Sequence, residues 1–323
     1  MIELPIKVKY FLSQNEIADL FNISPQAISI AAKQKGIEPF KDGNKSVFSP
    51  SNVRHLMESR GIIYPNKIIA FQMLKGGSTK TSTAFNLAVR LNQYGAKVLC
   101  IDLDPQGNLT DSFCVDITDE PVFFHVANGE CEIQDAILTI SENLDLIPSD
   151  FENSTLDFVI TSKNRDLRNF ISNYLEKIKK SYDFIIIDCN PSLSPLNISI
   201  ALACDEIVIP VNPDKYSSKG LKKTIEELDR IGREFKHKFD YSLLFTLFDG
   251  REATSQKYLI EYGTQYKDRL LSTVIKRNAD VKNAIDQKKT IFDFKKAPAR
   301  EDFDLLARDF LGLRDVGKKE NRA

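Results

Sequence analysis

Hydrophobic and polar positions alternate along most of the chain in blocks that predict strands and helices in turn. Short apolar runs, typical of strands buried on both faces of a sheet, occur at 67–74, 98–103, 183–189, 206–211, 241–248 and 270–275. Between them lie segments whose apolar positions recur every three or four residues, such as 80–95, about 151–180 and 217–235. This alternation predicts an α/β fold in which helices flank a mostly parallel sheet.

The first sixty or so residues follow a different pattern. Ser13 with Glu16 three positions later forms a capping box, and Ser24-Pro25 marks a second helix start. Two short helices joined by a tight link predict a helix-turn-helix, and a turn at 42–44 with a short strand after it predicts a wing. A further helix would be capped by Ser49 or Ser51. We therefore expect a small winged helix-turn-helix domain at 1–62 and a larger domain at 63–323, with a helix pair that has no role in DNA binding as the alternative.

The segment "KGGSTKTS" at 75–82 joins the first buried strand of the larger domain to a helix. Backbone N–H groups and the positive end of a helix dipole converge on an anion at such a place. Gly76 and Gly77 allow a phosphate to approach the backbone, Lys80 can reach terminal phosphates, and Thr81 can offer its hydroxyl to Mg²⁺. Thr79 stands where a glycine is usual, so it is strained if that position needs a positive φ.

The spelling of this loop is that of the deviant Walker A motif, and four further segments resemble ParA-type partition ATPases of the ParA/MinD superfamily in the same order. These are "IDLDPQGN", "FIIIDCNPSL", "VIPVNPDKYSSKGL" and "FTLFDGREATSQ". The resemblance runs from about Lys67 to Leu311 and implies a P-loop NTPase-like fold. Asn190 departs from the pattern, because the family more often has proline or alanine there. The N-terminal order of elements resembles the winged helix of MerR-like regulators.

The resemblance also implies roles for individual residues. Lys75 would reach the nucleotide of a partner subunit in an ATP-bound homodimer, and Lys80 would hold the β- and γ-phosphates. Asp104 would orient the attacking water. The expected catalytic residues are therefore Lys75, Lys80 and Asp104. ATP would be bound by the loop and by the adenine-side segment, through Lys75, Gly76, Gly77, Ser78, Thr79, Lys80, Thr81, Ser82, Pro213 and Asp214. Thr81 would ligate Mg²⁺ directly, and Asp102 and Asp188 would contact the ion through water.

Two DNA contacts are expected. The second N-terminal helix would present Gln26, Ser29 and Lys33 to a major groove. Between 266 and 300 there are ten Lys or Arg against four Asp or Glu, and the resemblance implies sequence-independent DNA binding by this basic segment. Its candidate contacts are Lys276, Arg277, Lys282, Lys288 and Lys289. A solvated basic surface is the alternative.

The composition limits the class of protein and the cellular compartment that we expect. The net charge of −1 excludes a uniformly basic protein, and the odd number of cysteines argues against a disulfide framework. No apolar run approaches the roughly 18 residues that span a bilayer, and the N-terminus lacks the features of a signal peptide. The final helix carries an apolar stripe flanked by Glu301 and Asp302, which anionic lipid would repel, so we expect it to pack on the domain rather than on a membrane. A cytoplasmic, nucleoid-associated protein is expected.

Together these features predict an ATPase that uses ATP/ADP and Mg²⁺, dimerises on ATP, binds DNA without sequence preference and segregates plasmid or chromosome DNA with a ParB-like partner. Repression of its own operon is expected as a second role. The alternative is a nucleotide-responsive transcription regulator with no part in transport.

Overall fold

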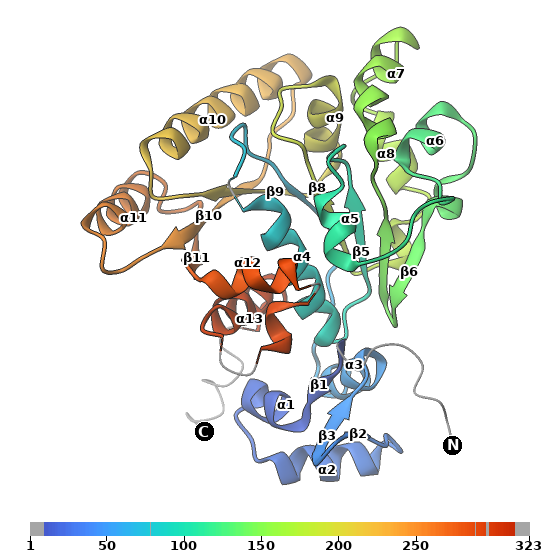
Figure 1. Cartoon of the computed structure of the whole chain (residues 1–323), viewed down its shortest axis with the longest axis vertical. Helices are drawn as coiled ribbons and strands as arrows, with labels where there is room; N and C mark the ends of the chain where they lie inside the picture. The colour runs from blue at the N-terminus through green and yellow to red at the C-terminus, as the bar shows by residue number, and fades with distance from the viewer. Residues whose placement is uncertain (1–9, 78, 288, 295–296, 314–323) are drawn as a thin grey trace.

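The computed structural model describes residues 10–77, 79–287, 289–294 and 297–313. A large sheet lies at the centre with helices on both faces, and the first elements of the chain gather at one end of the molecule (Figure 1). The strands of this sheet are β4 (Lys67–Phe71), β5 (Val98–Asp102), β6 (Leu138–Ser141), β7 (Leu144–Ile147), β8 (Phe184–Asp188), β9 (Glu206–Val211), β10 (Tyr241–Phe248) and β11 (Leu270–Lys276). Their spatial order is β11-β10-β9-β4-β8-β5-β7-β6, and every pair is parallel except β6 with β7. The predicted α/β fold with a mostly parallel sheet is confirmed.

Alternate residues of the central strands serve the two faces of the sheet. From β4, Ile69 and Phe71 join the cluster formed with α4 (Lys80–Gln93) and α13 (Ala299–Phe310). Ile68 and Ala70 point the other way, into a cluster built by four helices. These are α6 (Phe123–Asn128), α7 (Leu156–Ser162), α8 (Phe170–Leu175) and α9 (Pro195–Ala203). The remaining helices are α5 (Asn108–Phe113), α10 (Lys215–Phe235), α11 (Ala253–Gln265) and α12 (Ala279–Asp286).

The first elements of the chain form what we call the N-terminal unit, residues 10–59. It consists of α1 (Gln14–Phe21), α2 (Pro25–Gln34) and α3 (Pro50–Glu58) with β1 (Leu12–Ser13), β2 (Phe40–Asp42) and β3 (Lys45–Phe48). The strands make an antiparallel sheet in the order β1-β3-β2. The capping box of Ser13 with Glu16, the start of α2 at Pro25 and the cap of α3 by Ser49 are confirmed.

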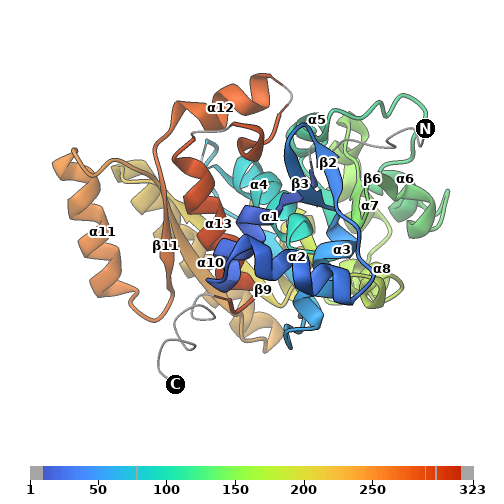
Figure 2. The ribbon, with the colours of Figure 1, turned by 90° about the horizontal axis from the view of Figure 1, so that it is seen from below.

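This unit packs on the end of α4. Figure 1 shows it below that helix, and Figure 2 views the molecule from the side of the unit. Its buried residues continue into the same apolar cluster as α4 and the sheet. Arg54 of α3 pairs with Asp183 at 2.5 Å and donates to the carbonyl of Gly95 at 3.1 Å. Gly95 has a φ of +86°, and a Cβ there would lie 2.6 Å from the backbone nitrogen of Arg54. The chain needs a glycine at this position because the two backbones meet so closely.

Two expectations about elements need correction, and one strand was not predicted. The segment 151–180 is not one helical stretch: it divides into the short 3₁₀ turn 151–155, α7, α8 and a further turn at 179–181. The break falls on the polar run around Asn164, whose φ of +48° cannot continue a helix. The antiparallel edge strand β6 was not expected. Helix α4 was predicted to bury one face, but its residues 83–93 are all buried, since α13 and the N-terminal unit cover the rest.

The apolar stripe of α13 packs on α4 and β11, as expected, with Phe303 and Leu306 fully buried. Within the described ranges, no helix combines the length and the apolar character required to cross a bilayer.

Candidate functional site

Three neighbouring strands end at one edge of the sheet, and the predicted chemistry gathers there. The strands β4, β8 and β5 lie side by side, so the loop after β4 meets Asp188 at the end of β8 and Asp102 at the end of β5. The loop leads directly into α4, which begins at Lys80. The fold therefore places backbone N–H groups, a lysine and two carboxylates around one point.

The loop has an unusual backbone. Both Gly77 and Thr79 have positive φ, at 69° and 64°. Left-handed residues turn successive N–H groups toward a common centre, which suits an anion. Thr79 is therefore strained, because a β-branched side chain is unfavourable in this region. Lys80 is only 7% exposed, while Gly76 and Gly77 are exposed to solvent. The predicted contact of Ser78 lies outside the described residues.

The two carboxylates are buried beneath the loop. Asp102 and Asp188 are paired in register across β5 and β8, and neither is exposed. Thr81 donates its hydroxyl to Asp188 Oδ2 at 2.6 Å. Asp102 Oδ2 accepts from the backbone N–H of Thr110 at 2.9 Å and from its hydroxyl at 2.8 Å.

One oxygen of this pair is unsatisfied. Asp188 Oδ1 is buried and has no hydrogen-bond partner among the residues that the structure describes. Burial raises the pKa of the Asp188 carboxyl, the nearby Asp102 raises it further, and Thr81 and Lys80 oppose the shift. Burial also raises the pKa of Asp102, against its bonds with Thr110. A bound divalent cation would reverse both shifts, so oxygen donors of this kind fit Mg²⁺.

A pocket opens above these groups. The loop lines it, together with Asp104, which follows β5, and Pro191, which follows β8; the other lining residues are Gly76, Gly77, Thr79, Lys80, Thr81, Ser82, Gln106, Asn108, Asp111 and Ser112. The Asp104 carboxylate accepts the N–H of Gln106 at 3.0 Å, and Ser149 donates to the Asp104 carbonyl at 2.8 Å. These bonds hold the carboxylate at the pocket wall.

Lys75 lies apart from this pocket. Its ammonium group pairs with Asp214 at 2.9 Å and lies 6.0 Å from the ring centroid of Tyr216. Asp214 also caps α10 by accepting the N–H of Ser217 at 2.8 Å. Burial would raise the pKa of Asp214, but the bonds from Ser217 and Lys75 outweigh it and lower that pKa. Neither Asp214 nor its buried neighbour Pro213 lines the pocket, and Asp214 pairs with Lys75 instead.

Sequence reasoning missed two residues that support the site. Asn212 donates to the carbonyl of Gly77 at 3.2 Å and accepts the hydroxyl of Thr246 at 2.7 Å, which ties the loop to β9 and β10. Thr110 orients Asp102. A polar side chain directly after a buried strand was the available signal for Asn212. Thr110 gave none, since its role depends on contacts distant in sequence.

The predicted DNA contacts fall into two groups. On α2, the side chains of Gln26, Ser29 and Lys33 are exposed on one face, although Gln14 Nε2 lies 2.7 Å from the Ser29 hydroxyl. In the basic segment, Lys282 and Lys289 are exposed. Two others are already paired, Lys276 with Asp302 at 2.8 Å and Arg277 with Glu252 at 3.1 Å. Lys288 lies outside the described residues.

Comparison with known proteins agrees with this geometry. The family model AAA_31, described as an AAA domain, matches residues 66–241. The chain is 32% identical to the sporulation initiation inhibitor protein Soj of Bacillus subtilis, over 70% of this chain and 90% of that protein. It is 34% identical to the virulence plasmid ParA family protein pGP5-D of Chlamydia psittaci, over 70% of this chain and 87% of that protein.

Solved structures share the fold. A complex of Cyanothece McdA with ATP is 24% identical, with a TM-score of 0.69, over 76% of this chain and 96% of that chain. A cobyrinic acid a,c-diamide synthase from Mycobacterium smegmatis with bound ATP analogue and magnesium is 25% identical, with a TM-score of 0.63, over 76% of this chain and 95% of that chain. The fold, the loop with its buried carboxylates and these likenesses lead to one assignment: the chain belongs to the ParA/Soj family of P-loop ATPases.

Proposed function

We propose that this protein binds ATP with Mg²⁺ at the loop after β4, hydrolyses it, and uses the cycle to segregate plasmid or chromosome DNA. The observation that carries the proposal is the placement of Lys80 and Thr81 at the start of α4, directly over the buried Asp102 and Asp188. Similar proteins include a chromosome partitioning protein ParA of Caulobacter vibrioides and a chromosome-partitioning ATPase Soj of Treponema pallidum, which supports the role in segregation.

The residues divide the chemistry among them. Backbone N–H groups of the loop and the Lys80 ammonium group bind the phosphates. Thr81, Asp188 and Asp102 would hold Mg²⁺, whose positive charge would offset the negative charge of the phosphates. Asp104, held at the pocket wall, orients the attacking water. Positioning and electrostatics carry most of phosphoryl transfer, so one such carboxylate is sufficient.

ATP binding, in this proposal, closes a homodimer in which Lys75 leaves Asp214 and reaches the phosphates of the partner's nucleotide. The closed dimer holds DNA of any sequence through the basic segment that includes Lys282 and Lys289. A ParB-like partner speeds hydrolysis and so releases the DNA. The N-terminal unit acts as a winged helix-turn-helix that binds an operator through α2 and represses the operon of the protein.

Nucleotide binding tests the first step. Lys80→Ala removes the charge that holds the phosphates, so we expect ATP affinity to fall by at least about 100-fold, measured by calorimetry with Mg²⁺. Lys257→Ala, which removes an exposed lysine of α11, is the matched control and should bind as the unchanged protein does. Equal binding by Lys80→Ala would overturn the assignment of the loop.

Hydrolysis and DNA binding test the second step. Asp104→Ala keeps the phosphate ligands, so it should bind ATP, turn over at least about 10-fold more slowly and remain on random-sequence DNA. Phosphate release measures the turnover, and filter binding measures how much protein remains on the DNA. Normal turnover by this variant would exclude Asp104 as the group that orients water.

The exposed face of α2 favours one alternative, a nucleotide-responsive regulator without a transport role. Such a protein would bind one operator and need no partner, whereas a partition ATPase binds random DNA only with ATP. The same filter-binding assay on both kinds of DNA separates the two.

A further inference from the structure

The turn after β8 has two sides with different surroundings. Pro191 lines the nucleotide pocket together with Lys80 and Thr81. On the other side, Asn190 and Ser192 face α9, the helix that follows the turn. The position of the pocket wall therefore depends on how the turn is held to α9.

One side chain makes that attachment. Asn197, in the first turn of α9, points its Nδ2 group at four oxygens of the turn. The distances are 3.0 Å to the Asn190 carbonyl, 2.8 Å to Asn190 Oδ1, 2.7 Å to the Ser192 carbonyl and 3.2 Å to Ser192 Oγ. The amide carries two hydrogens, so it satisfies two of these oxygens at a time and shares them among the rest.

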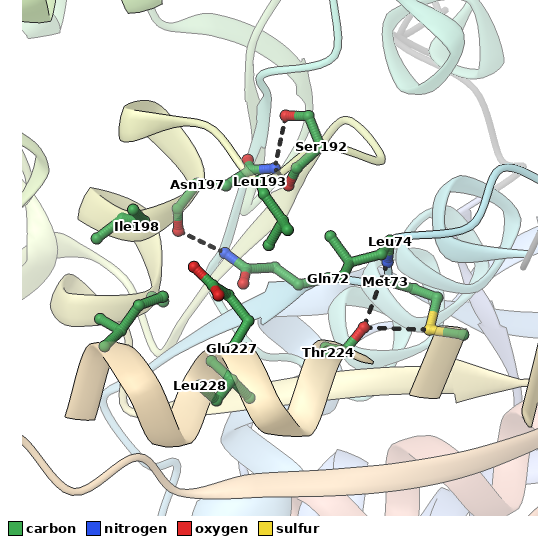
Figure 3. Close-up of a pocket in the computed structure, with 12 residues that line it drawn as sticks. Gln72, Met73, Leu74, Ser192, Leu193, Asn197, Ile198, Thr224, Glu227 and Leu228 are labelled. Carbon is green, nitrogen blue, oxygen red and sulfur yellow. Dashed lines mark hydrogen bonds between the residues drawn. The ribbon is translucent and has the colours of Figure 1, made fainter. Parts of the chain in front are cut away.

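Asn197 is itself held by a residue of the segment that joins β4 to the phosphate-binding loop. Gln72, which directly follows β4 and precedes the loop, donates from its Nε2 to the Asn197 carbonyl at 3.0 Å. Figure 3 shows Asn197 between Ser192 above it and Gln72 below it. The segments after β4 and β8, which both contribute to the wall of the nucleotide pocket, are thus joined through this residue, which does not itself line the pocket.

Packing alone does not explain an asparagine here. Asn197 is 7% exposed, and its Oδ1 is buried without a hydrogen-bond partner among the described residues. A buried unpaired acceptor lowers stability, so an apolar residue would suit this helix position better. What the amide provides is its N–H groups, and these are directed at the turn.

Asn190 has only part of the backbone restraint that a proline would have at this position. Its φ is not fixed by a ring, although the following Pro191 restricts its conformation and its carbonyl accepts the N–H of Ser192 at 3.0 Å. The bonds from Asn197, with the bond that Ser192 Oγ donates to Asn190 Oδ1 at 2.7 Å, add side-chain restraints to the turn.

We propose that Asn197 is a positioning residue for ATP hydrolysis: it holds the turn 190–192 so that the pocket wall at Pro191 keeps its place beside the phosphates. This inference rests on the proposed ATPase function. Phosphoryl transfer depends on the placement of groups by fractions of an ångström, while binding of the nucleotide relies mainly on the loop after β4. Loosening the turn should therefore slow turnover and leave binding almost unchanged.

The test compares Asn197→Ala, Asn190→Ala and the double variant with the unchanged protein, and Asn173→Ala is the matched control. Asn173 is an exposed asparagine of α8 that does not line the nucleotide pocket. We expect Asn197→Ala to lower kcat by about 10-fold with KM for ATP within about 2-fold, a split that a general loss of structure does not give. The double variant should lose less than the sum of the two single losses, because both changes remove the bond between Asn197 Nδ2 and Asn190 Oδ1.

Hydrogen exchange gives a second measurement that needs no activity. In Asn197→Ala, amides of the segment 189–198 should exchange faster, while the rest of the described chain keeps its rates. A kcat within about 2-fold of the unchanged protein, or additive losses in the double variant, would overturn the inference even though ATP is hydrolysed. If the unchanged protein does not hydrolyse ATP, the proposed function fails first, and unaltered exchange in Asn197→Ala would then show that Asn197 does not hold the turn either.

Discussion

Thr79 illustrates how single residues of the loop adopt conformations that their local preferences oppose. It precedes α4 with a φ of 64°, and the N–H of Thr83 and the hydroxyl of Ser82 both bond to its carbonyl. Those bonds hold the residue in a region that a β-branched side chain avoids. The sequence could say only that threonine would be strained if φ were positive, because φ depends on the folded loop.

Replacing Thr79 by glycine should raise the free energy of unfolding by roughly 1 kcal/mol, since the relief of strain exceeds the entropy that glycine adds to the unfolded chain. Urea unfolding followed by circular dichroism measures the change. Thr155→Gly is the control, because Thr155 has an ordinary φ of −91° and its replacement should not stabilise the protein. Equal effects at both positions would contradict the strain at Thr79.

Among the elements, α4 connects the nucleotide loop with the N-terminal unit. Its first residue is Lys80, and its last turns meet α3 and α13. Near its end, Arg90 is almost fully buried and pairs with Glu16 of α1 at 3.1 Å and with Asp304 of α13 at 2.5 Å. The guanidinium also lies over the rings of Tyr94 and Phe292. One residue thus joins three helices that are far apart in sequence.

We expect Arg90→Met to lower the free energy of unfolding by about 3 kcal/mol, because it removes the buried partner that two carboxylates share and leaves each with one other arginine, Arg300 beside Glu16 and Arg308 beside Asp304. Thermal and urea unfolding measure this loss. Arg230→Met provides the comparison: Arg230 bridges Glu227 and Glu234 on the exposed side of α10, and its loss should leave stability nearly unchanged. Similar losses in the two variants would argue against a structural role for the buried pair.

At the scale of the whole molecule, the carboxylates that join its parts make stability depend on pH. Burial would raise the pKa of Glu16, but Arg90 and Ser13 outweigh it and lower that pKa. The pKa of Asp304 is also lowered, since Arg90 and Arg308 outweigh its burial. A carboxyl with a lowered pKa in the folded state contributes stability above its unfolded pKa and loses it as the pH falls through the folded value.

The unfolding midpoint should therefore change little from this source between pH 7 and about pH 5 and should fall below about pH 4. The chain has no tryptophan, so circular dichroism is the suitable signal. In Glu16→Gln the decline on acidification should be shallower, because one of the two titrating groups is gone. An identical acid profile for Glu16→Gln and the unchanged protein would contradict the assignment.

The sequence predicted those parts of the molecule that local patterns determine. These parts depend on residues that are close together in sequence. They include the buried strands, the helix caps at Ser13, Ser24 and Ser49, and the loop that ends at Lys80. Contacts between distant segments were not predictable from one sequence. The pair of Lys75 with Asp214 spans 139 positions, and that of Arg54 with Asp183 spans 129. No local pattern records such pairs, and the same holds for the edge strand β6.

The close fit of Gly95 against Arg54 limits how such a protein can be rebuilt. The N-terminal unit cannot be grafted onto another ATPase as an independent module, because its acceptor surface includes the last turns of α4 and the glycine after them. A chimera that keeps the N-terminal unit must also keep the surface of α4 and Gly95 that contacts it. An ATPase from which the unit is deleted would need polar residues in place of the apolar side chains of α4 that the deletion exposes.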